Sequence, residues 1–336
     1  MSSFLHFGRG KCSYTCNKKL LFLILLVAVI VVNILLYAFG FLTHSAAKII
    51  TLAELPNFLV PAPHNLKEVR DDELCDLMPK FVNTVLPYPN VNVTENDLKQ
   101  LDKLDISEGG AWKPHDCVSQ HHVAIVVPYR DRIQNLHVFL YHMHPFLQAQ
   151  KLNYQIFIVE QTHQRPFNRA KLFNVGFSEA GKISPFHCFI FTDVDLIPQN
   201  LNNMYACTEL PRHMTAYIDV FDYQLPYGSL FGGAVAILKS YFERVNGFSN
   251  TFYGWGGEDD DFFNRVTRNG SRICRYEYKI SKYVMLSHKK QKPSEDRYHL
   301  LETGVDRFLT DGLNSLKYSV LSLDKLPLYT RILTDL

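Results

Sequence analysis

Residues Phe186–Asp195 have the sequence FHCFIFTDVD, which combines a predicted buried strand with a pair of acids. Its first part, Phe186–Phe191, is rich in aromatic and apolar residues without regular alternation, which is typical of a strand covered on both faces of a sheet. Two earlier runs, His122–Val127 and Tyr154–Val159, have the same character. The sequence therefore predicts three buried parallel strands.

Helical patterns separate these strands. Apolar residues recur at helical spacing over residues 133–147 and again over 166–177, where Pro166 suits the first turn of a helix. Strand, helix, strand, helix, strand is the order of a doubly wound, Rossmann-like half-sheet of the α/β class. Such sheets bind ligands beyond the carboxyl ends of their strands, so functional residues are expected directly after each run.

Charged and polar residues do follow each predicted strand. In chain order the three loops contain Pro128, Tyr129, Arg130, Asp131 and Arg132, then Phe167, Asn168 and Arg169, then Asp193, Val194 and Asp195. Arginine forks suit phosphate oxygens, and carboxylates suit a hard cation such as Mg²⁺ or Mn²⁺. Taken singly, the D-x-D pair could be a turn, the arginines surface charges and Asn168 a helix cap. Together the loops predict a metal-bridged diphosphate site, and the sequence contains neither a P-loop nor a dinucleotide fingerprint.

A second cluster combines glycines, aromatic residues and four consecutive acids in Tyr253–Asp261. The simplest explanation is a helix N-terminus, which favours negative charge. The glycines would also allow a ligand to approach closely, and Trp255 offers a flat face for a sugar ring. Because a carboxylate held there could act as a general base, we expect a catalytic, sugar-binding cluster.

The net charge of +2 comes from the start of the chain, where four basic residues and no acid precede residue 20. Without those four, 31 basic residues face 33 acidic ones. Nucleic-acid binders normally carry a strong positive field on their folded part. Nucleic acid is therefore excluded as a partner.

Residues 20–42 form an apolar run whose only clear interruptions are Asn33 and Gly40. At about 1.5 Å per residue, a helix of that length spans a hydrocarbon core of about 30 Å. A cleaved signal peptide has a shorter apolar region, of about 7 to 15 residues. We therefore predict a cytoplasmic tail at 1–19, an uncleaved transmembrane anchor at 20–42, a stem at 43–74 and a catalytic domain at 75–336. The basic residues before the run place that domain in the lumen.

The cysteines fit an oxidising lumen, where disulfides persist. Five of them follow the predicted anchor: Cys75, Cys117, Cys188, Cys207 and Cys274. The odd number suggests two bridges and one free thiol. Sequons at Asn92 and Asn269 are compatible with glycosylation in the same compartment.

Several long motifs resemble those of the β-1,4-galactosyltransferase family. They are Phe167–Phe177, Asp193–Pro198, Phe231–Gly233, Gly254–Asp261, Asp311–Leu316 and Pro327–Thr330. The resemblance runs from about Cys75 to the C-terminus and is strongest to the invertebrate-type β-1,4-N-acetylgalactosaminyltransferase branch. It implies a GT-A glycosyltransferase fold with a D-x-D metal site, a single-pass type II location in the Golgi membrane, Mn²⁺ as cofactor, a UDP-sugar donor and inversion at the anomeric carbon.

The resemblance also implies roles for individual residues. Asp259 matches the catalytic base, Glu258 a group that holds donor or acceptor, and Asp195, Met285 and His288 the metal ligands. The implied donor contacts are Pro128, Tyr129, Arg130, Asp131, Arg132, Phe167, Asn168, Arg169, Val194, Asp195, Leu230, Trp255 and His288. The implied acceptor contacts are Tyr227, Gly256, Gly257, Glu258, Asp259, Asp260 and Arg297. The implied bridges are Cys75 with Cys117 and Cys188 with Cys207, which leaves Cys274 free.

The sequence departs from the family pattern at informative places. Tyr129 stands where the family usually has Phe, and the segment from His288 to Arg297 is three residues shorter than in typical vertebrate members. Chemistry alone would make Met285 a core residue, because a thioether is a soft donor and manganese a hard ion. Leu230 occupies the position before Phe-Gly-Gly, where galactose-transferring members have Tyr and N-acetylgalactosamine-transferring members have Leu or Ile.

We therefore expect a manganese-dependent, inverting transferase that moves N-acetylgalactosamine (GalNAc) from UDP-GalNAc to the 4-OH of terminal β-N-acetylglucosamine (GlcNAc) on N-glycans or glycolipids. An aliphatic Leu230 leaves room for the N-acetyl group. One alternative is a UDP-galactose β-1,4-galactosyltransferase, in which Leu230 reflects neutral drift. Another is a non-catalytic glycan-binding or chaperone subunit of the same fold. The expected partners are the UDP-sugar, a GlcNAc-terminated glycan and the membrane.

Overall fold

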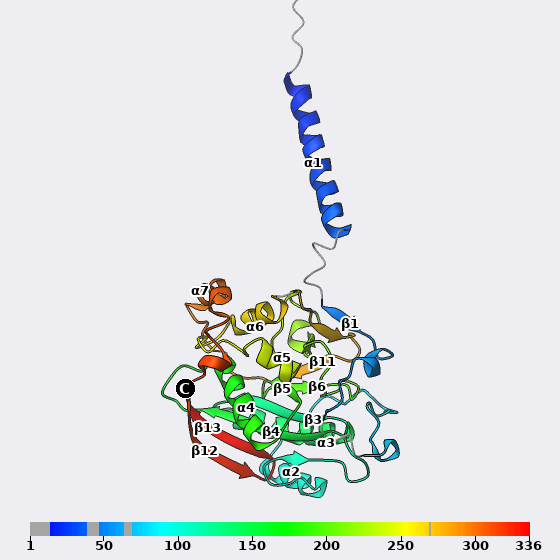
Figure 1. Cartoon of the computed structure of the whole chain (residues 1–336), viewed down its shortest axis with the longest axis vertical. Coiled ribbons are helices and arrows are strands. Elements are labelled where there is room, and N and C mark those ends of the chain that lie inside the picture. Colours follow the sequence, from blue (N-terminus) through cyan, green and yellow to red (C-terminus); the bar gives the residue numbers. More distant parts are fainter. Residues whose placement is uncertain (1–13, 39–46, 64–68, 269, 290) are drawn as a thin grey trace, which may run out of the picture. The chain divides into compact units, whose positions relative to one another are not determined.

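The computed structural model describes residues 14–38, 47–63, 69–268, 270–289 and 291–336 (Figure 1). Two compact units are present, Met1–Ser45 and Ala46–Leu336.

In the first unit the described residues form helix α1 (Tyr14–Ala38), which covers most of the predicted anchor. Within the described ranges, no helix combines the length and the apolar character that crossing a membrane requires. The predicted anchor is therefore not confirmed. Its residues 39–42, and residues 1–13 of the predicted tail, lie outside the described ranges.

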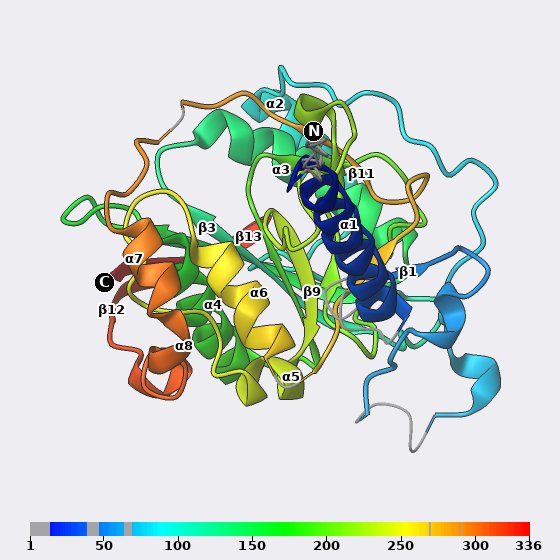
Figure 2. The same ribbon diagram turned by 90° about the horizontal axis from the view of Figure 1, so that it is seen from above.

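Three parallel strands form the centre of the second unit, as the apolar runs predict. β3 (His122–Tyr129) lies between β4 (Asn153–Gln161) and β5 (Cys188–Thr192). The predicted helices are α3 (Ile133–Ala149) and α4 (Arg169–Ile183), although α4 begins three residues after Pro166, so this proline is not in its first turn. Their apolar residues belong to two separate core clusters, one on each face of the sheet, and Figure 2 shows α3 and α4 on opposite sides of β3.

Further strands extend this sheet at both edges, in the order β1-β10-β7-β9-β5-β3-β4-β13-β12, with β2 paired to β4. Their bounds are β1 (Lys48–Ile50), β10 (Cys274–Tyr276), β7 (Arg212–His213), β9 (Ala234–Leu238), β13 (Tyr329–Asp335), β12 (Ser319–Leu326) and β2 (Ala111–Trp112). β9 is antiparallel to both β5 and β7, and β13 is parallel to β4. The sheet is therefore mixed, with a parallel centre.

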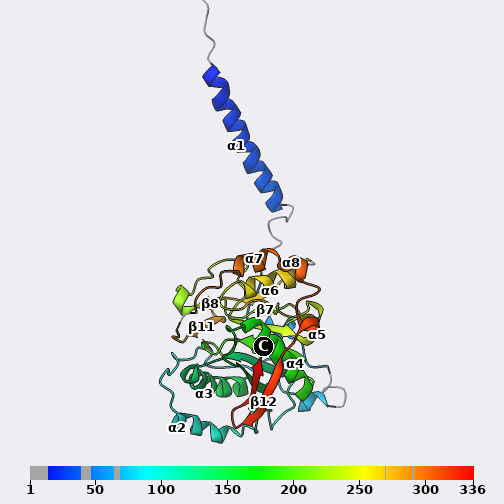
Figure 3. The same ribbon diagram turned by 90° about the vertical axis from the view of Figure 1, so that its left-hand side faces the viewer.

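A small second sheet has the order β6-β11-β8. Its strands are β6 (Leu196–Pro198), β11 (Lys282–Met285) and β8 (Tyr217–Ile218). The other α-helices are α2 (Glu95–Leu98), α5 (Lys239–Arg244), α6 (Glu258–Thr267), α7 (Arg297–Glu302) and α8 (Gly304–Arg307). The 3-10 helices are Leu55–Asn57, Asp71–Glu73, Lys99–Leu104, Asp219–Phe221 and Leu313–Ser315. α6 contacts α7 and α8, and Figure 3 shows the three together.

The folded unit begins before the predicted boundary at Cys75. β1 pairs in parallel with β10, and Leu55 and Leu59, which follow β1 in the chain, are buried in the core. The segment 43–74 is therefore not simply a stem, although its residues 43–46 and 64–68 lie outside the described ranges. Its sequence has no sustained period, so a strand of three residues left no pattern from which it could be predicted.

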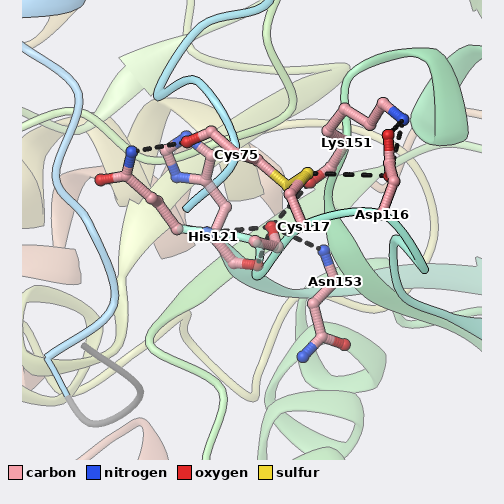
Figure 4. Close-up of a disulfide and its surroundings, with 8 residues drawn as sticks. Cys75, Asp116, Cys117, His121, Lys151 and Asn153 are labelled. Carbon is pink, nitrogen blue, oxygen red and sulfur yellow. Dashed lines mark hydrogen bonds and ion pairs between the residues drawn. A yellow bond between two sulfur atoms is a disulfide. The ribbon is translucent and has the colours of Figure 1, made fainter. Parts of the chain in front are cut away.

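Both predicted disulfides are present. Cys75 is bonded to Cys117 and Cys188 to Cys207, and the buried Cys274 is free. Figure 4 shows the first bridge beside the ion pair between Lys151 and Asp116, whose nitrogen and oxygen lie 2.8 Å apart. Of the two sequons, Asn92 is exposed, whereas Asn269 lies outside the described residues.

Candidate active site

Arg169 joins the loops at the carboxyl ends of the central strands. Its Nε and Nη2 donate to the two carboxylate oxygens of Asp193 at 2.5 and 3.1 Å, and Nη2 also donates to the Gly233 carbonyl at 3.0 Å. Its Nη1 lies 3.7 Å from Glu258 Oε1. The loop after β5, the segment before β9 and the start of α6 therefore meet at the first residue of α4.

The two acids of the D-x-D pair have different partners. Asp193 is paired with Arg169, whereas Asp195 contacts Arg132 and His288. Arg169, expected as a diphosphate contact, also offsets the charge of two acids. This partnership was not visible in the sequence, because the residues lie 24 positions apart.

The second acid, Asp195, lies with His288 and Arg132. Its Oδ2 is 3.1 Å from both His288 Nε2 and Arg132 Nη1. Burial, followed by the charge of Asp193, raises the pKa of Asp195 to about 6. A buried carboxylate beside an imidazole is a suitable start for a divalent-cation site.

The third predicted ligand, Met285, is brought close by the small sheet. β11 pairs with β6 so that Met285 opposes Leu196, next to Asp195, and the Leu286 N–H donates to the Asp195 carbonyl at 2.7 Å. Asp219 accepts a hydrogen bond from the Met285 N–H at 2.9 Å. In the part of the chain that the structure describes, no group of three His, Cys, Asp or Glu residues could hold a metal ion. Asp195 and His288 are suitable ligands for manganese, whereas the thioether of Met285 is a softer donor than this ion prefers.

The four consecutive acids divide into separate roles at the start of α6. Glu258 is buried, and its Oε2 has no hydrogen-bond partner among the described residues. Burial is the main cause that raises the pKa of Glu258 to about 7, repulsion from Asp259 adds to it, and Arg169 opposes it. The structure thus holds this carboxyl beside the site in an easily protonated state.

Asp259 lies against the Phe231–Gly233 motif. A Cβ on Gly232 would overlap Asp259 Oδ2, so only glycine allows the carboxylate to sit there. Burial raises the pKa of Asp259, while Arg169 lowers it. No side chain among the described residues donates a hydrogen bond to its carboxylate. Asp259 is therefore placed to accept a proton from a ligand.

The remaining two acids do not join this pair. Asp260 accepts a hydrogen bond from the Tyr227 hydroxyl at 3.1 Å, which brings two predicted acceptor contacts together. Asp261 forms a buried ion pair with Arg265 at 2.7 Å. Asp261, to which the sequence assigned no individual role, therefore has structural contacts.

The loop after β3 has one residue that faces the metal-ligand candidates. The Arg132 guanidinium contacts Asp195, and the backbone N–H of Arg132 donates to the Tyr129 hydroxyl at 3.3 Å. Arg130 instead donates to the carbonyls of Thr162 and Arg165. Arg132 is thus the better-placed arginine for a diphosphate, while Asp131 is exposed and Pro128 is buried in β3.

Asn168 is a helix cap, as its simplest explanation predicts. Its Oδ1 accepts from the Lys171 N–H at 2.9 Å and its Nδ2 donates to the Asn250 carbonyl at 2.8 Å. Val194 is buried in the core, and the Phe167 ring lies 5.2 Å from the Arg130 guanidinium. The side chains of Asn168 and Val194 therefore support the site rather than line it.

The glycine-rich segment before α6 packs against the segment before α7. Gly256 and Gly257 have φ values of 107° and 92°, which favour glycine. A Cβ on Gly256 would lie 2.9 Å from Arg297 Cδ. Trp255 is 56% exposed, and its carbonyl accepts from the Ser294 N–H at 3.0 Å. Arg297 and Trp255 thus lie on either side of this contact, and among the described residues neither forms a hydrogen bond or ion pair with the Glu258 carboxylate.

Three buried residues under the Leu230–Gly233 loop were missed by the sequence analysis: His213, Thr215 and Arg275. Thr215 donates a hydrogen bond to the Gly232 carbonyl, and Arg275 donates one to the Leu230 carbonyl. His213 accepts a hydrogen bond from Arg275. They lie on short strands or beside them, without a motif. Only their burial as polar residues identifies them.

The raised pKa values of Glu258 and Asp259 predict a dependence of activity on pH. Each carboxyl keeps its proton to a higher pH than usual, so the base is lost on the acid side. At saturating manganese, kcat/KM should fall by about tenfold per pH unit on the acid side, beginning at a higher pH than for an ordinary aspartate. The measurement is the pH profile of kcat/KM for the wild-type protein. A rate that stays constant down to about pH 4 would contradict a raised pKa at the base.

Two family models match the chain. Residues 76–208 match the N-terminal region of glycosyl transferase group 7, and residues 212–289 match the N-terminal domain of galactosyltransferase. The chain is 43% identical over 263 residues to β-1,4-galactosyltransferase 1 of Bos taurus, covering 77% of this chain and 65% of that protein. It is 41% identical over 263 residues to β-1,4-galactosyltransferase 6 of Mus musculus, covering 75% and 68%. The chain thus spans slightly less than two thirds of the first relative.

A solved structure gives the same result. The catalytic domain of Drosophila β-1,4-galactosyltransferase 7 with xylobiose is 28% identical, with a TM-score of 0.55, and covers 64% of this chain and 93% of that one. A mutant of the same enzyme has been solved with manganese, UDP-Gal and xylobiose. The mixed sheet with its parallel centre is thus the fold of a GT-A glycosyltransferase. Within that class, the chain belongs to the β-1,4-galactosyltransferase family.

Proposed function

We propose that the chain is a manganese-dependent, inverting β-1,4-glycosyltransferase that moves a hexose from a UDP-sugar to the 4-OH of a terminal β-GlcNAc. The observation that carries this proposal is Asp259, whose carboxylate packs on Gly232 beside Glu258 and Arg169, with no side chain of the described residues donating to it. A carboxylate so placed is suited to deprotonating a sugar hydroxyl.

The proposed reaction assigns a step to each group. Asp259 takes the proton of the acceptor hydroxyl as that oxygen bonds to the anomeric carbon, and the bond from that carbon to UDP breaks with its electron pair on the phosphate oxygen. Arg132 is placed to bind the diphosphate. Asp195, His288 and Met285 would hold manganese, whose positive charge would offset that of the departing diphosphate.

Galactose is the donor sugar that the relatives favour. The bovine and mouse relatives are galactosyltransferases by name, and the Drosophila enzyme was solved with UDP-Gal. Leu230 favours the second candidate, UDP-GalNAc, because it stands where galactose-transferring members carry tyrosine. The acceptors proposed for either donor are GlcNAc-terminated N-glycans or glycolipids.

A donor comparison tests the proposal. The full-length protein, purified in detergent, is incubated with Mn²⁺, a GlcNAc-terminated acceptor and either UDP-Gal or UDP-GalNAc. Transfer of one sugar in a β-1,4 linkage is expected. If neither sugar is transferred while the protein still binds the glycan, the non-catalytic alternative replaces the proposal.

Leu230→Tyr is predicted to shift the donor preference toward galactose. The larger side chain and its hydroxyl would crowd an N-acetyl group at the 2-position, so the kcat/KM ratio of UDP-Gal to UDP-GalNAc should rise by about tenfold or more. Both rates are measured on one preparation. An unchanged ratio would show that residue 230 does not contact the 2-substituent.

We also propose a Golgi location with the catalytic unit in the lumen. The apolar run at 20–42, the basic residues before it and the two disulfides support this topology. Protease added to sealed Golgi vesicles should leave the catalytic unit intact. Its digestion without detergent would contradict the proposed orientation.

A further inference from the structure

We infer that Arg275 is a positioning residue for donor selection, because it fixes the backbone of the turn that carries Leu230. This inference rests on the proposed function, since it concerns the donor of that reaction. Arg275 belongs to β10, far along the chain from the turn, and only 3% of its surface is exposed.

A single nitrogen of Arg275 closes the turn. Nη2 donates to the carbonyl of Gly228 at 2.9 Å and to that of Leu230 at 2.7 Å. The Leu230 N–H donates to the Tyr227 carbonyl at 3.2 Å. Both polar backbone groups of Leu230 are therefore held, one by the turn itself and one by the guanidinium. The direction in which its side chain leaves the backbone depends on these bonds.

His213 orients the guanidinium. Arg275 Nε donates to His213 Nδ1 at 3.0 Å, which requires a neutral imidazole with its proton on Nε2. Burial lowers the pKa of His213 well below its usual value, so the ring is neutral. His213 lies in β7, the strand that pairs with β10.

Thr215 connects the pair of Arg275 and His213 to Gly232, at the other end of the loop that carries Leu230. His213 Nε2 lies 3.4 Å from Thr215 Oγ1, which donates to the Gly232 carbonyl at 2.9 Å. Gly232 in turn packs on Asp259. Arg275 and its neighbours therefore hold the segment from Leu230 to Gly232 against the proposed base.

The charge of Arg275 is not used in an ion pair. No carboxylate among the described residues lies within salt-bridge distance of it, and its bonded partners are two carbonyls and a neutral imidazole. Burying a guanidinium without a carboxylate is costly. Its hydrogen bonds all serve one loop or the histidine beneath that loop, which is the pattern of a group that fixes geometry.

Arg212 provides a matched control. It is also a fully buried arginine at this end of the sheet, and it opposes Cys274, the residue before Arg275. Its guanidinium bonds to the Met204 carbonyl and lies 3.9 Å from the centre of the Tyr276 ring, with no bond to the turn. Because side chains alternate along a strand, the two arginines serve opposite faces.

The test compares donor ratios in Arg275→Met, Arg275→Lys and Arg212→Met. For each full-length variant, kcat/KM is measured with UDP-Gal and with UDP-GalNAc on one preparation, so the folded fraction cancels from the ratio. Arg275→Met should change the ratio by about threefold or more, because the carbonyls of Gly228 and Leu230 lose the donor that fixes the turn. Arg275→Lys should lie nearer wild type, and Arg212→Met should stay within about twofold of it.

A second measurement uses the coupling to Leu230. The shift in donor ratio caused by Leu230→Tyr should be smaller in the Arg275→Met background than in wild type. If Arg275→Met does not fold, His213→Phe removes the acceptor of Nε and should change the ratio in the same direction. Equal ratios in wild type and a folded Arg275→Met, or in wild type and His213→Phe, would overturn the inference. Wild-type protein that transfers neither sugar contradicts the proposed function and the inference with it, whereas active enzyme with a constant ratio contradicts the inference alone.

Discussion

Asp259→Asn is expected to lower kcat by about 10²- to 10⁴-fold, the usual contribution of a general base. The amide keeps the shape of the side chain but cannot take the proton of the acceptor hydroxyl. Because Asp259 accepts no hydrogen bond from another side chain of the described residues, its replacement should leave the melting temperature and the affinity for UDP close to those of wild type. Single-turnover rates and UDP titration measure the two effects separately.

Asp260→Asn is the matched control for this change. Asp260 lies one position along α6 and contacts the Tyr227 hydroxyl at 3.1 Å. Its replacement should raise KM for the acceptor while kcat stays within about tenfold of wild type, as for a group that binds acceptor without taking its proton. If Asp259→Asn kept kcat within tenfold of wild type, Asp259 would not be the base, and Glu258 would be the next group to test.

Asp261→Asn is expected to act on stability instead of catalysis. Asp261 and Arg265 form an ion pair at 2.7 Å with both side chains buried, and the Arg265 guanidinium also contacts Asp311. Removing one partner of a buried pair leaves the other charge poorly compensated, which costs about 3 kcal/mol. For a domain of this size, Tm should fall by about 6 to 12 °C.

The measurement is thermal unfolding of the full-length variant beside Asp260→Asn, whose Tm should change little. At a temperature where Asp261→Asn is folded, its kcat should match that of wild type. A normal Tm together with a lost kcat would place Asp261 in the reaction and contradict the division of the four acids. Asp259 and Asp261, two positions apart in α6, are thus expected to act on catalysis and on stability, respectively.

The central fold could be predicted because its signals are local. The strands β3, β4 and β5 coincide with continuous apolar runs, and the helical stripes between them have a clear period, so their order followed from the sequence. β1 and β10 have only three residues each, and pairing between distant short strands leaves no local pattern. For that reason Lys48–Ile50 was expected in a stem and not in the sheet.

The site was predicted in its parts but not in its partnerships. The positions of Asp195 and Arg132 followed from the rule that ligands bind beyond strand ends. The cap at Asn168 was one of the explanations that the sequence offered. The ion pair of Arg169 with Asp193, by contrast, joins residues 24 positions apart and depends on a three-dimensional contact. Arg275 was missed for the same reason, since one arginine in a short strand does not reveal that it supports a loop about 45 residues away.

Product analysis with wild-type protein and Asp259→Asn side by side tests whether the chain is an inverting β-1,4-glycosyltransferase with Asp259 as its base. The full-length proteins are given Mn²⁺, a GlcNAc-terminated acceptor and each UDP-sugar, and the linkage and anomeric configuration of the product are determined by NMR. We expect a β-1,4-linked sugar from the α-linked donor, formed by wild type and nearly absent with Asp259→Asn. An α-linked product, or equal product from both proteins, would contradict this expectation.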